Sequence, residues 1–248
     1  MTIHFSRPSP HVALIELDLP PTNALGDAMR RLMVAGLEAI EADPDVRCIV
    51  LTGRGRLFCA GNDLRELANR TPEDLSPISD FNALMARTEA LRMPVIAAVN
   101  GGALGGGLDL ALSCDIRLAS EAATFTASGV NVGLMASVGR LPKLIGVGPA
   151  KAMLLTGQPV DAATAFRVGL VTAVWPAADL LDEALKLAGQ IAARAPLAVE
   201  AAKRFAGMAA AEQALAMDGA LADLAASEDH REAVASFLEK RAAVFKRR

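Results

Sequence analysis

The sequence predicts an α/β fold in which helices cover a largely parallel sheet. Apolar segments of strand length alternate along the chain with segments of helical periodicity, and this alternation predicts right-handed βαβ units. The strand segments are continuous apolar runs, as expected of a sheet that is buried on both faces. The chain has 248 residues, of which 52% are hydrophobic. This length suits one large α/β domain, alone or with a small appendage.

The first half of the chain supplies most of the expected sheet. Pro20 and Pro21 interrupt the chain after the first strand, and Gly101 and Gly102 follow the third. The expected strands are 12–17, 46–52, 94–100 and 116–119, and the expected helices are 27–42 and 108–113.

The rest of the chain, from about residue 149, is predicted to be mostly helical. Asp161 has the position of an N-cap for a helix over residues 161–167. Further helices are expected over 180–194 and 197–208, followed by a long segment from about 211 to 245. We divide the chain into an α/β core, residues 1–190, and a C-terminal helical region, residues 191–248, suited to packing on a neighbouring subunit.

Composition excludes several classes of protein. The net charge is −3 and both signs are interspersed, so the chain lacks the basic stripe of a nucleic-acid-binding protein. No apolar run approaches the roughly 20 residues needed to cross a bilayer, and the N-terminus lacks the features of a signal peptide. We therefore expect a soluble, cytoplasmic protein that binds neither nucleic acid nor membrane.

The three cysteines, Cys48, Cys59 and Cys114, lie in apolar runs. Their odd number argues against a disulfide framework, and no C-x-x-C spacing indicates a metal site. We expect reduced, buried thiols and no bound metal.

The first segment with chemical potential is residues 58–67. Gly61 permits an unusual turn between a strand and a helix that begins around Asp63. Unpaired N–H groups at such a helix start suit an anion. Alone, this pattern is typical of an ordinary turn.

The second segment is residues 100–109, which hold five glycines within seven residues, directly after a buried strand. So many glycines indicate close approach by a ligand or another strand. A phosphate-binding loop does not fit, because the Gly-Lys-Ser/Thr ending is absent and a dinucleotide motif belongs at the first βα turn. Two such turns could converge on one oxygen as an oxyanion hole. From spacing alone, two unrelated tight turns remain the simpler interpretation.

A resemblance to a known family favours the oxyanion hole. Residues 58–64, Phe-Cys-Ala-Gly-Asn-Asp-Leu, resemble the segment F-C-A-G-x-D-L/I of the enoyl-CoA hydratase/isomerase (crotonase) family, and residues 97–116 are similar to its second signature. Shorter matches occur at 23–25, 133–134, 140–142, 155–157, 169–171 and 237–241. The resemblance covers essentially the whole chain. It implies a crotonase-type spiral of ββα units around two sheets, a C-terminal helical region, and a homotrimer or a dimer of trimers.

The resemblance also implies a site. The backbone N–H groups of Asn62 and Gly106 would form the oxyanion hole for an acyl-CoA thioester. Coenzyme A would be part of the substrate, with no tightly bound cofactor. The positions implied to contact substrate or CoA are Ala24, Ala60, Gly61, Asp63, Leu64, Gly105, Gly129, Phe245 and Lys246. Phe245 and Lys246 would act across a subunit boundary; a frayed, solvated terminus is the alternative for these two.

The acid–base residues depart from the family pattern. Family hydratases use two glutamates, and Asp109 stands at the first position. Asp109 follows Gly106 by three residues, so a helix would place its carboxylate on the side of the hole, although Asp is about 1.5 Å shorter than Glu. Gly129 stands at the second position and has no side chain to transfer a proton. The neighbouring polar side chains, at Ser128, Asn131, Ser137 and Arg140, include no good base near neutral pH.

Three functions follow from these residues. The leading hypothesis is an enoyl-CoA hydratase, a lyase that adds water to a 2-enoyl-CoA, with Asp109 handling the water or a proton. An acyl-CoA decarboxylase or isomerase is the second, because both reactions also exploit enolate stabilisation. A catalytically weak acyl-CoA-binding protein is the third, and in that case Asp109 would be only a helix-start charge.

Overall fold

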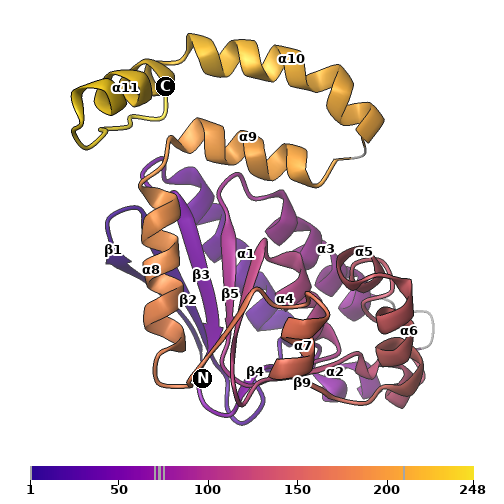
Figure 1. Cartoon of the computed structure of the whole chain (residues 1–248). Coiled ribbons are helices and arrows are strands. Elements are labelled where there is room, and N and C mark those ends of the chain that lie inside the picture. The colour runs from indigo at the N-terminus through magenta and orange to yellow at the C-terminus, as the bar shows by residue number, and fades with distance from the viewer. Residues whose placement is uncertain (1, 70, 72–73, 75, 209) are drawn as a thin grey trace.

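Six strands form the main sheet of the protein (Figure 1). The computed structural model describes residues 2–69, 71, 74, 76–208 and 210–248. In chain order the strands are β1 (Thr2–Ser9), β2 (Val12–Asp18), β3 (Cys48–Gly53), β5 (Val95–Val99), β7 (Ile116–Ser120) and β10 (Ala173–Trp175). They lie side by side in this order, with β1 antiparallel to β2 and the other pairs parallel.

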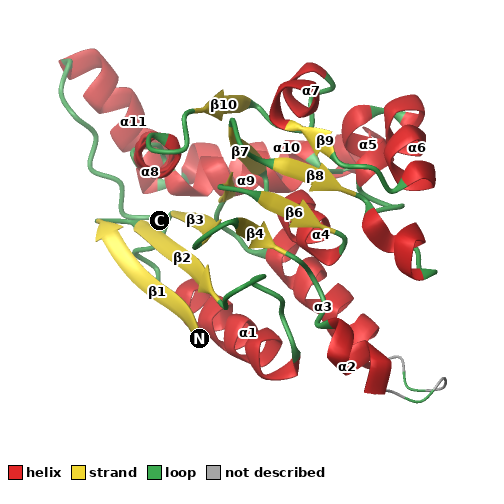
Figure 2. Cartoon of the chain, turned by 90° about the horizontal axis from the view of Figure 1, so that it is seen from below, coloured by secondary structure: helices red, strands yellow, loops and turns green. Residues whose placement is uncertain are grey.

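Four short strands form a second sheet, and Figure 2 shows three of them side by side. They are β4 (Leu57–Cys59), β6 (Gly102–Leu104), β8 (Thr124–Thr126) and β9 (Val160–Asp161). β4, β6 and β8 each come directly after a long strand of the main sheet, and each is followed by a helix. This repeated strand–strand–helix order confirms the ββα units that the resemblance implies.

Helices cover both faces of the main sheet. They are α1 (Asp27–Ala42), α2 (Leu64–Asn69), α3 (Ser76–Ala90), α4 (Gly106–Ser113), α5 (Leu141–Ile145), α6 (Val147–Thr156), α7 (Ala162–Arg167), α8 (Leu180–Ala192), α9 (Pro196–Ala206), α10 (Ala210–Ala226) and α11 (Glu228–Glu239). On β3, Cys48 and Val50 pack with α8, while Ile49 and Leu51 face the main core. The alternation explains why every residue of this strand is buried.

α4 is fixed inside the molecule at its C-terminal end. All its residues from Gly107 to Ser113 are buried. The guanidinium of Arg117, itself 5% exposed, donates hydrogen bonds to the carbonyl oxygens of Cys114 at 2.6 Å and Leu170 at 2.9 Å. A cation beside the last carbonyls of a helix stabilises that end. The N-terminus of α4, which begins at Gly106, is therefore held in a defined place.

The structure confirms several predicted elements. The helix over 27–42 has the predicted bounds, and Asp161 caps α7 by accepting a hydrogen bond from the N–H of Thr164 at 2.8 Å. All three cysteines are buried and unpaired, and burial raises the pKa of each thiol to about 12.

Other predictions were wrong or incomplete. The helical segment expected over 211–245 ends early, at residue 239, and comprises two helices, because Ser227 starts α11 by accepting a hydrogen bond from the N–H of His230 at 3.0 Å. α11 ends where Lys240 takes a left-handed φ of 54°. The sequence patterns also did not predict β1, α3, β10 and the short strands of the second sheet. No described helix is long and apolar enough to cross a membrane.

Candidate active site

A cavity of about 1130 Å³ lies where the second sheet meets α1, α2 and α4. Its lining contains most of the site positions implied by the resemblance: Ala24, Ala60, Asn62, Asp63, Leu64, Gly105, Gly106, Asp109 and Gly129. Apolar side chains such as Phe81 supply much of the rest. The structure thus brings together residues that lie up to about 100 positions apart in the sequence, as a pocket for a small molecule requires.

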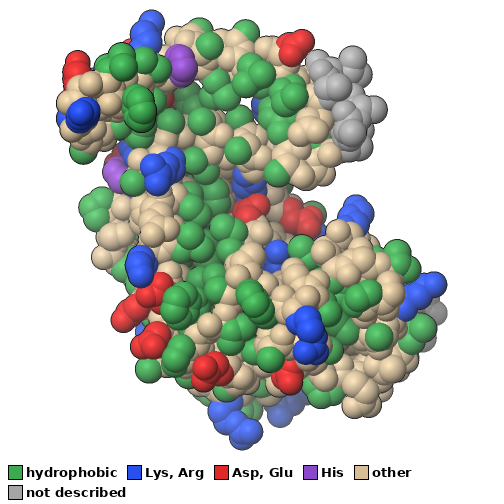
Figure 3. All heavy atoms as spheres, in the orientation of Figure 1, with side chains coloured by type: hydrophobic (Ala, Val, Ile, Leu, Met, Phe, Trp, Pro, Cys, Tyr) green, Lys and Arg blue, Asp and Glu red, His purple; other side chains and the backbone are tan. Residues whose placement is uncertain are grey.

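A second cavity, of about 1140 Å³, lies under α9 and α10. Figure 3 shows acidic and basic side chains together in the hollow beneath α9. These charges are largely paired with one another: Arg92 with Glu200 at 2.8 Å, Arg140 with Glu89 at 2.5 Å, and Lys203 with Asp115 at 2.8 Å. Because most of its charges already have partners, this cavity is the weaker candidate for chemistry.

Two glycine-containing turns touch each other at the first cavity. Gly61 has a φ of +85°, and a Cβ atom there would lie 2.6 Å from the nitrogen and 2.7 Å from the Cα of Gly106. At Gly107, a Cβ atom would lie 1.8 Å from the carbonyl oxygen of Cys59. Only glycine allows these two backbones to approach so closely. The glycines noted in the sequence therefore serve close backbone packing.

This contact places two backbone donors side by side. Asn62 and Gly106 both line the cavity and are partly accessible. Within the described residues, neither N–H group has a hydrogen-bond acceptor. The segment before Asn62 is held by the N–H of Leu25, which donates to the Gly61 carbonyl at 2.8 Å, and by the N–H of Ala60, which donates to Thr22 at 3.0 Å. Two preorganised donors facing one cavity suit an oxygen that gains negative charge during reaction.

Asn23 stabilises the turn at Gly61 and Asn62, called the donor turn below. The resemblance matched this residue but assigned it no role. Its side-chain amide donates to the carbonyl oxygens of Arg54 at 3.0 Å and Leu57 at 2.8 Å, and its Oδ1 accepts from the N–H of Leu19 at 2.8 Å. Asn23 is 2% exposed. It therefore joins the segment before α1 to the strand that leads into the Gly61 turn.

Arg30 is a second supporting residue, and it is not among the site positions expected from the sequence. Its side chain is 3% exposed and donates to the carbonyl oxygen of Leu25 at 3.0 Å and to both carboxylate oxygens of Glu66, at 2.8 and 2.7 Å. The pair joins α1 to α2 around the Asn62 turn. The sequence does contain a pattern that indicates this role. Arg30 lies on the same helix face as the buried Met33 and Leu37, where an arginine needs a partner.

Asp109 is the carboxylate of the site. It lies in the first turn of α4, is 9% exposed, and its Oδ2 accepts a hydrogen bond from the backbone N–H of Ser137 at 3.2 Å. Oδ1 is buried and has no partner among the described residues. Burial raises the pKa of Asp109, while the hydrogen bonding from Ser137 and the charge of Arg140 act in the opposite direction. Such a carboxyl group is suited to exchanging a proton with a ligand.

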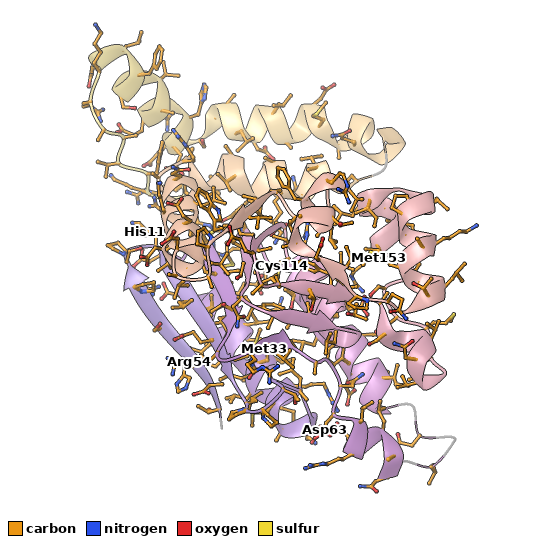
Figure 4. The ribbon with its side chains drawn as sticks, turned by 60° about the horizontal axis from the view of Figure 1, so that its bottom comes forward. His11, Met33, Arg54, Asp63, Cys114 and Met153 are labelled. Atoms are coloured by element: carbon orange, nitrogen blue, oxygen red, sulfur yellow. The ribbon has the colours of Figure 1, made fainter. Side chains whose placement is uncertain are left out.

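The other carboxylates of the lining are already engaged. Glu66 pairs with Arg30, Asp27 pairs with Arg31, and Asp63 accepts from the backbone N–H of Arg65 at 2.9 Å. Figure 4 labels Asp63 at the turn before α2. Asp109 is thus the lining carboxylate, among the described residues, with an unpartnered buried oxygen.

Gly129 packs against a loop, residues 134–136, which occupies the space that a side chain at position 129 would need. A Cβ atom at Gly129 would lie 2.8 Å from both the nitrogen of Ala136 and the carbonyl oxygen of Leu134. The N–H of Leu134 donates to the Gly129 carbonyl at 2.8 Å. The position thus lacks a carboxylate and also has no room for one, because the backbone of residues 134–136 takes that space.

Phe245 and Lys246 lie away from the cavity of their own chain. The carbonyl oxygen of Phe245 accepts a hydrogen bond from Arg47 at 2.7 Å, and the N–H of Lys246 donates to Asp229 at 2.8 Å. Figures 1 and 4 show the C-terminal helices and the α2 turn at opposite ends of the molecule. Contact of these two residues with CoA across a subunit boundary stays a prediction. Within the described residues, no group of three or more metal-ligating side chains that could hold a metal ion is present.

Comparisons with known proteins agree on one family. The family model described as enoyl-CoA hydratase/isomerase matches residues 8–248. The chain is 41% identical to the putative enoyl-CoA hydratase/isomerase YngF of Bacillus subtilis, over 99% of this chain and 98% of that protein. It is 39% identical to the 2,3-dehydroadipyl-CoA hydratase of Escherichia coli, over 96% of each chain. Among solved structures, the enoyl-CoA hydratase of Bacillus anthracis matches with a TM-score of 0.96 and 34% identity, over 100% of both chains.

Proposed function

The chain belongs to the enoyl-CoA hydratase/isomerase family, and we propose on that basis that it adds water to a 2-enoyl-CoA bound in the cavity at Asn62 and Gly106. Members of this enzyme family act on CoA thioesters, so coenzyme A enters as part of the substrate. The observation that carries the proposal is the pair of unpaired backbone donors beside a buried carboxylate in one cavity.

The two donors bind the thioester oxygen. As the oxygen of water attacks the β-carbon of the enoyl group, electrons move through the double bond onto that thioester oxygen. The N–H groups of Asn62 and Gly106 then stabilise the resulting enolate without having to reorganise. One such donor contributes about 10²–10³-fold to the rate of comparable enzymes.

Asp109 carries the proton. As a carboxylate, it accepts one proton from the attacking water, whose hydroxyl group bonds to the β-carbon. The protonated Asp109 then gives the proton to the α-carbon of the enolate, which returns the carboxylate to its starting state. The raised pKa of Asp109 suits this double role, because a group that titrates closer to neutrality both accepts and returns a proton readily.

The filled space at Gly129 favours a second candidate, an acyl-CoA decarboxylase or isomerase. Loss of carbon dioxide from a malonyl-type thioester leaves an enolate without any base, and a single acid then protonates it. Isomerisation needs one group to move a proton between two carbons. Asp109 is able to serve either reaction alone. A third candidate is an acyl-CoA-binding protein with little turnover.

The test is the hydration of a short 2-enoyl-CoA, followed by the loss of its enoyl-thioester absorbance. We expect turnover by the natural chain and a fall of about 10²–10⁴-fold in Asp109→Ala. Carbon dioxide release from malonyl-type thioesters without hydration would favour the decarboxylase. Tight binding of CoA esters, with no turnover of any substrate in the panel, would favour the binding protein.

We further propose that residues 191–248 assemble the chain into a trimer or a dimer of trimers. Supporting this, Phe237 is 83% exposed and Leu238 is 73% exposed on α11, an exposure typical of association surfaces. Light scattering of the natural chain tests the proposal: a monomer at micromolar concentration would contradict it. Loss of the assembly in a Phe237→Asp, Leu238→Asp variant would support it.

A further inference from the structure

Ser128 offers a free hydroxyl group to the cavity. It is the first residue of a short 3₁₀ helix, Ser128–Val132, which ends next to the loop over Gly129. Ser128 lines the cavity and is partly accessible. Within the described residues, its hydroxyl makes no hydrogen bond. A serine hydroxyl on a cavity wall without a protein partner is available to a ligand or to water.

The hydroxyl lies beside the turn that carries the Gly106 donor. A Cβ atom built on Gly105 would lie 2.8 Å from Ser128 Oγ, so this oxygen sits against the residue that precedes the Gly106 donor. The Gly105 carbonyl accepts a hydrogen bond from the N–H of Asp109 at 3.1 Å. Gly105 and Asp109 are therefore one helical turn apart, and residues at that spacing lie on the same side of a helix.

Asp109 lines the same cavity as Ser128. Its Oδ2 is held by the N–H of Ser137 at 3.2 Å, while its buried Oδ1 has no partner among the described residues. Ser137 directly follows residues 134–136, the loop that fills the space above Gly129, and Ser128 directly precedes Gly129. The residue whose N–H holds the Asp109 carboxyl group and the residue that carries the hydroxyl therefore belong to two segments that pack against each other.

We propose that Ser128 Oγ and the Asp109 carboxylate together hold the water molecule that attacks the substrate, so that Ser128 is a catalytic residue of the hydration reaction. This inference rests on the proposed hydratase function. A water molecule has two O–H bonds. When one donates to Asp109 and the other to Ser128 Oγ, a lone pair of the water oxygen is left for the β-carbon.

The proton balance involves Asp109 alone. The water proton passes to the Asp109 carboxylate, the hydroxyl group bonds to the β-carbon, and Asp109 returns the proton to the α-carbon. Ser128 neither gains nor loses a proton in the cycle, because a serine hydroxyl is not a base near neutral pH. Its contribution is the alignment of the water, which is an orientation effect.

If Ser128 holds the water, its loss should affect the rates of two reactions at this site differently. Exchange of an α-proton of butyryl-CoA with solvent deuterium needs the oxyanion hole and Asp109 but no attacking water. Hydration of crotonyl-CoA needs all of these. Removal of the Ser128 hydroxyl should therefore slow hydration and spare exchange.

The experiment compares Ser128→Ala and Ser128→Thr with the natural chain. We expect Ser128→Ala to lower kcat for crotonyl-CoA hydration about tenfold, the effect of one lost hydrogen bond, with KM and the deuterium exchange rate each within about twofold. Ser128→Thr keeps a hydroxyl and should recover most of the hydration rate. Val130→Ala, in the same 3₁₀ helix but 46% exposed and outside the cavity lining, is the matched control and should match the natural chain in both reactions.

Three results would overturn the inference. Unchanged hydration in Ser128→Ala would show that the hydroxyl does not hold the water. Equal loss of hydration and exchange would show that Ser128 only supports the local structure. A natural chain that exchanges the α-proton but never hydrates would remove both this inference and the hydratase function, and the natural chain alone reveals that case.

Discussion

The two walls of the cavity are built on different principles. The donor wall, at Gly61, Asn62 and Gly106, consists of backbone that is held by strand-like hydrogen bonds and by direct contact between glycines. The acid wall depends on the Asp109 side chain, which one backbone N–H of a loop orients. Under the proposed function, the fold itself thus determines how a thioester oxygen is bound. The proton chemistry depends on a few side chains that are free to change without disturbing the fold.

The largest effect should come from breaking the donor wall. In Gly61→Ala, the added methyl group would lie 2.6 Å from the Gly106 nitrogen at a φ of +85°. The two turns must then separate, and both N–H groups lose their positions. We expect kcat/KM for the CoA thioester to fall by at least about 100-fold, measured by steady-state kinetics.

Gly55→Ala is the matched control for that substitution. Gly55 also has a positive φ, +79°, but a Cβ atom there meets nothing within 4 Å. The control therefore carries the backbone strain without the collision. Equal loss of activity in the two variants would mean that strain, and not the contact between the turns, explains the effect.

A smaller effect should come from loosening the support of the donor wall. Arg30→Met removes the hydrogen bond to the Leu25 carbonyl and leaves Glu66 without its partner. We expect the free energy of unfolding to fall by about 2 kcal/mol and kcat to fall about tenfold, because the Leu25 segment also binds Gly61. Denaturant unfolding and steady-state kinetics measure the two effects.

Arg31→Met is the neighbouring control. The Arg31 side chain is 77% exposed and pairs with Asp27 on the surface, so its loss should leave the free energy of unfolding essentially unchanged. An Arg30→Met variant that behaves like Arg31→Met in both measurements would contradict the supporting role of Arg30.

The smallest effect concerns Asp109 in the acid wall and how it makes the stability of the protein depend on pH. Burial raises the pKa of Asp109 in the folded chain. Protonated Asp109 therefore contributes to the stability of the folded state below the pKa that this residue has in the unfolded chain. That contribution is lost as the pH rises through the pKa of Asp109 in the folded chain. Asp109→Asn avoids the cost of the buried charge. We expect its Tm at pH 7 to exceed that of the natural chain by about 2–4 °C, with the difference vanishing below about pH 4.

Asp161→Asn is the control, because the pKa of Asp161 is shifted in the opposite direction to that of Asp109. Hydrogen bonding from Thr164 lowers the pKa of this exposed N-cap, so its stabilisation is present above the unfolded pKa and is lost as pH falls through the folded pKa. The variant should not gain Tm at pH 7. A gain in Asp161→Asn similar to that in Asp109→Asn would indicate a general charge effect instead of burial.

Local patterns in the sequence predicted β2, β3, β5 and β7 and the N-cap at Asp161, because apolar runs and a capping residue depend on neighbouring residues. The short strand β4 and the edge strand β10 carry only three residues each, too few for a periodic pattern. The resemblance located Gly129, but the filling of its space by residues 134–136 depends on a loop that only the folded chain brings there. Arg30 was missed for a similar reason, since its partner Glu66 is 36 positions away.

The backbone origin of the two donors has a consequence for mutational scanning of this enzyme. An N–H group survives every substitution except proline, so replacing Asn62 alters its side chain and leaves the donor in place. A scan of single substitutions would therefore register the neighbours, Gly61 and Gly107, as intolerant and position 62 as comparatively permissive. Ranking positions by sensitivity would point to the residues that make room for the donors and would overlook a residue that provides one.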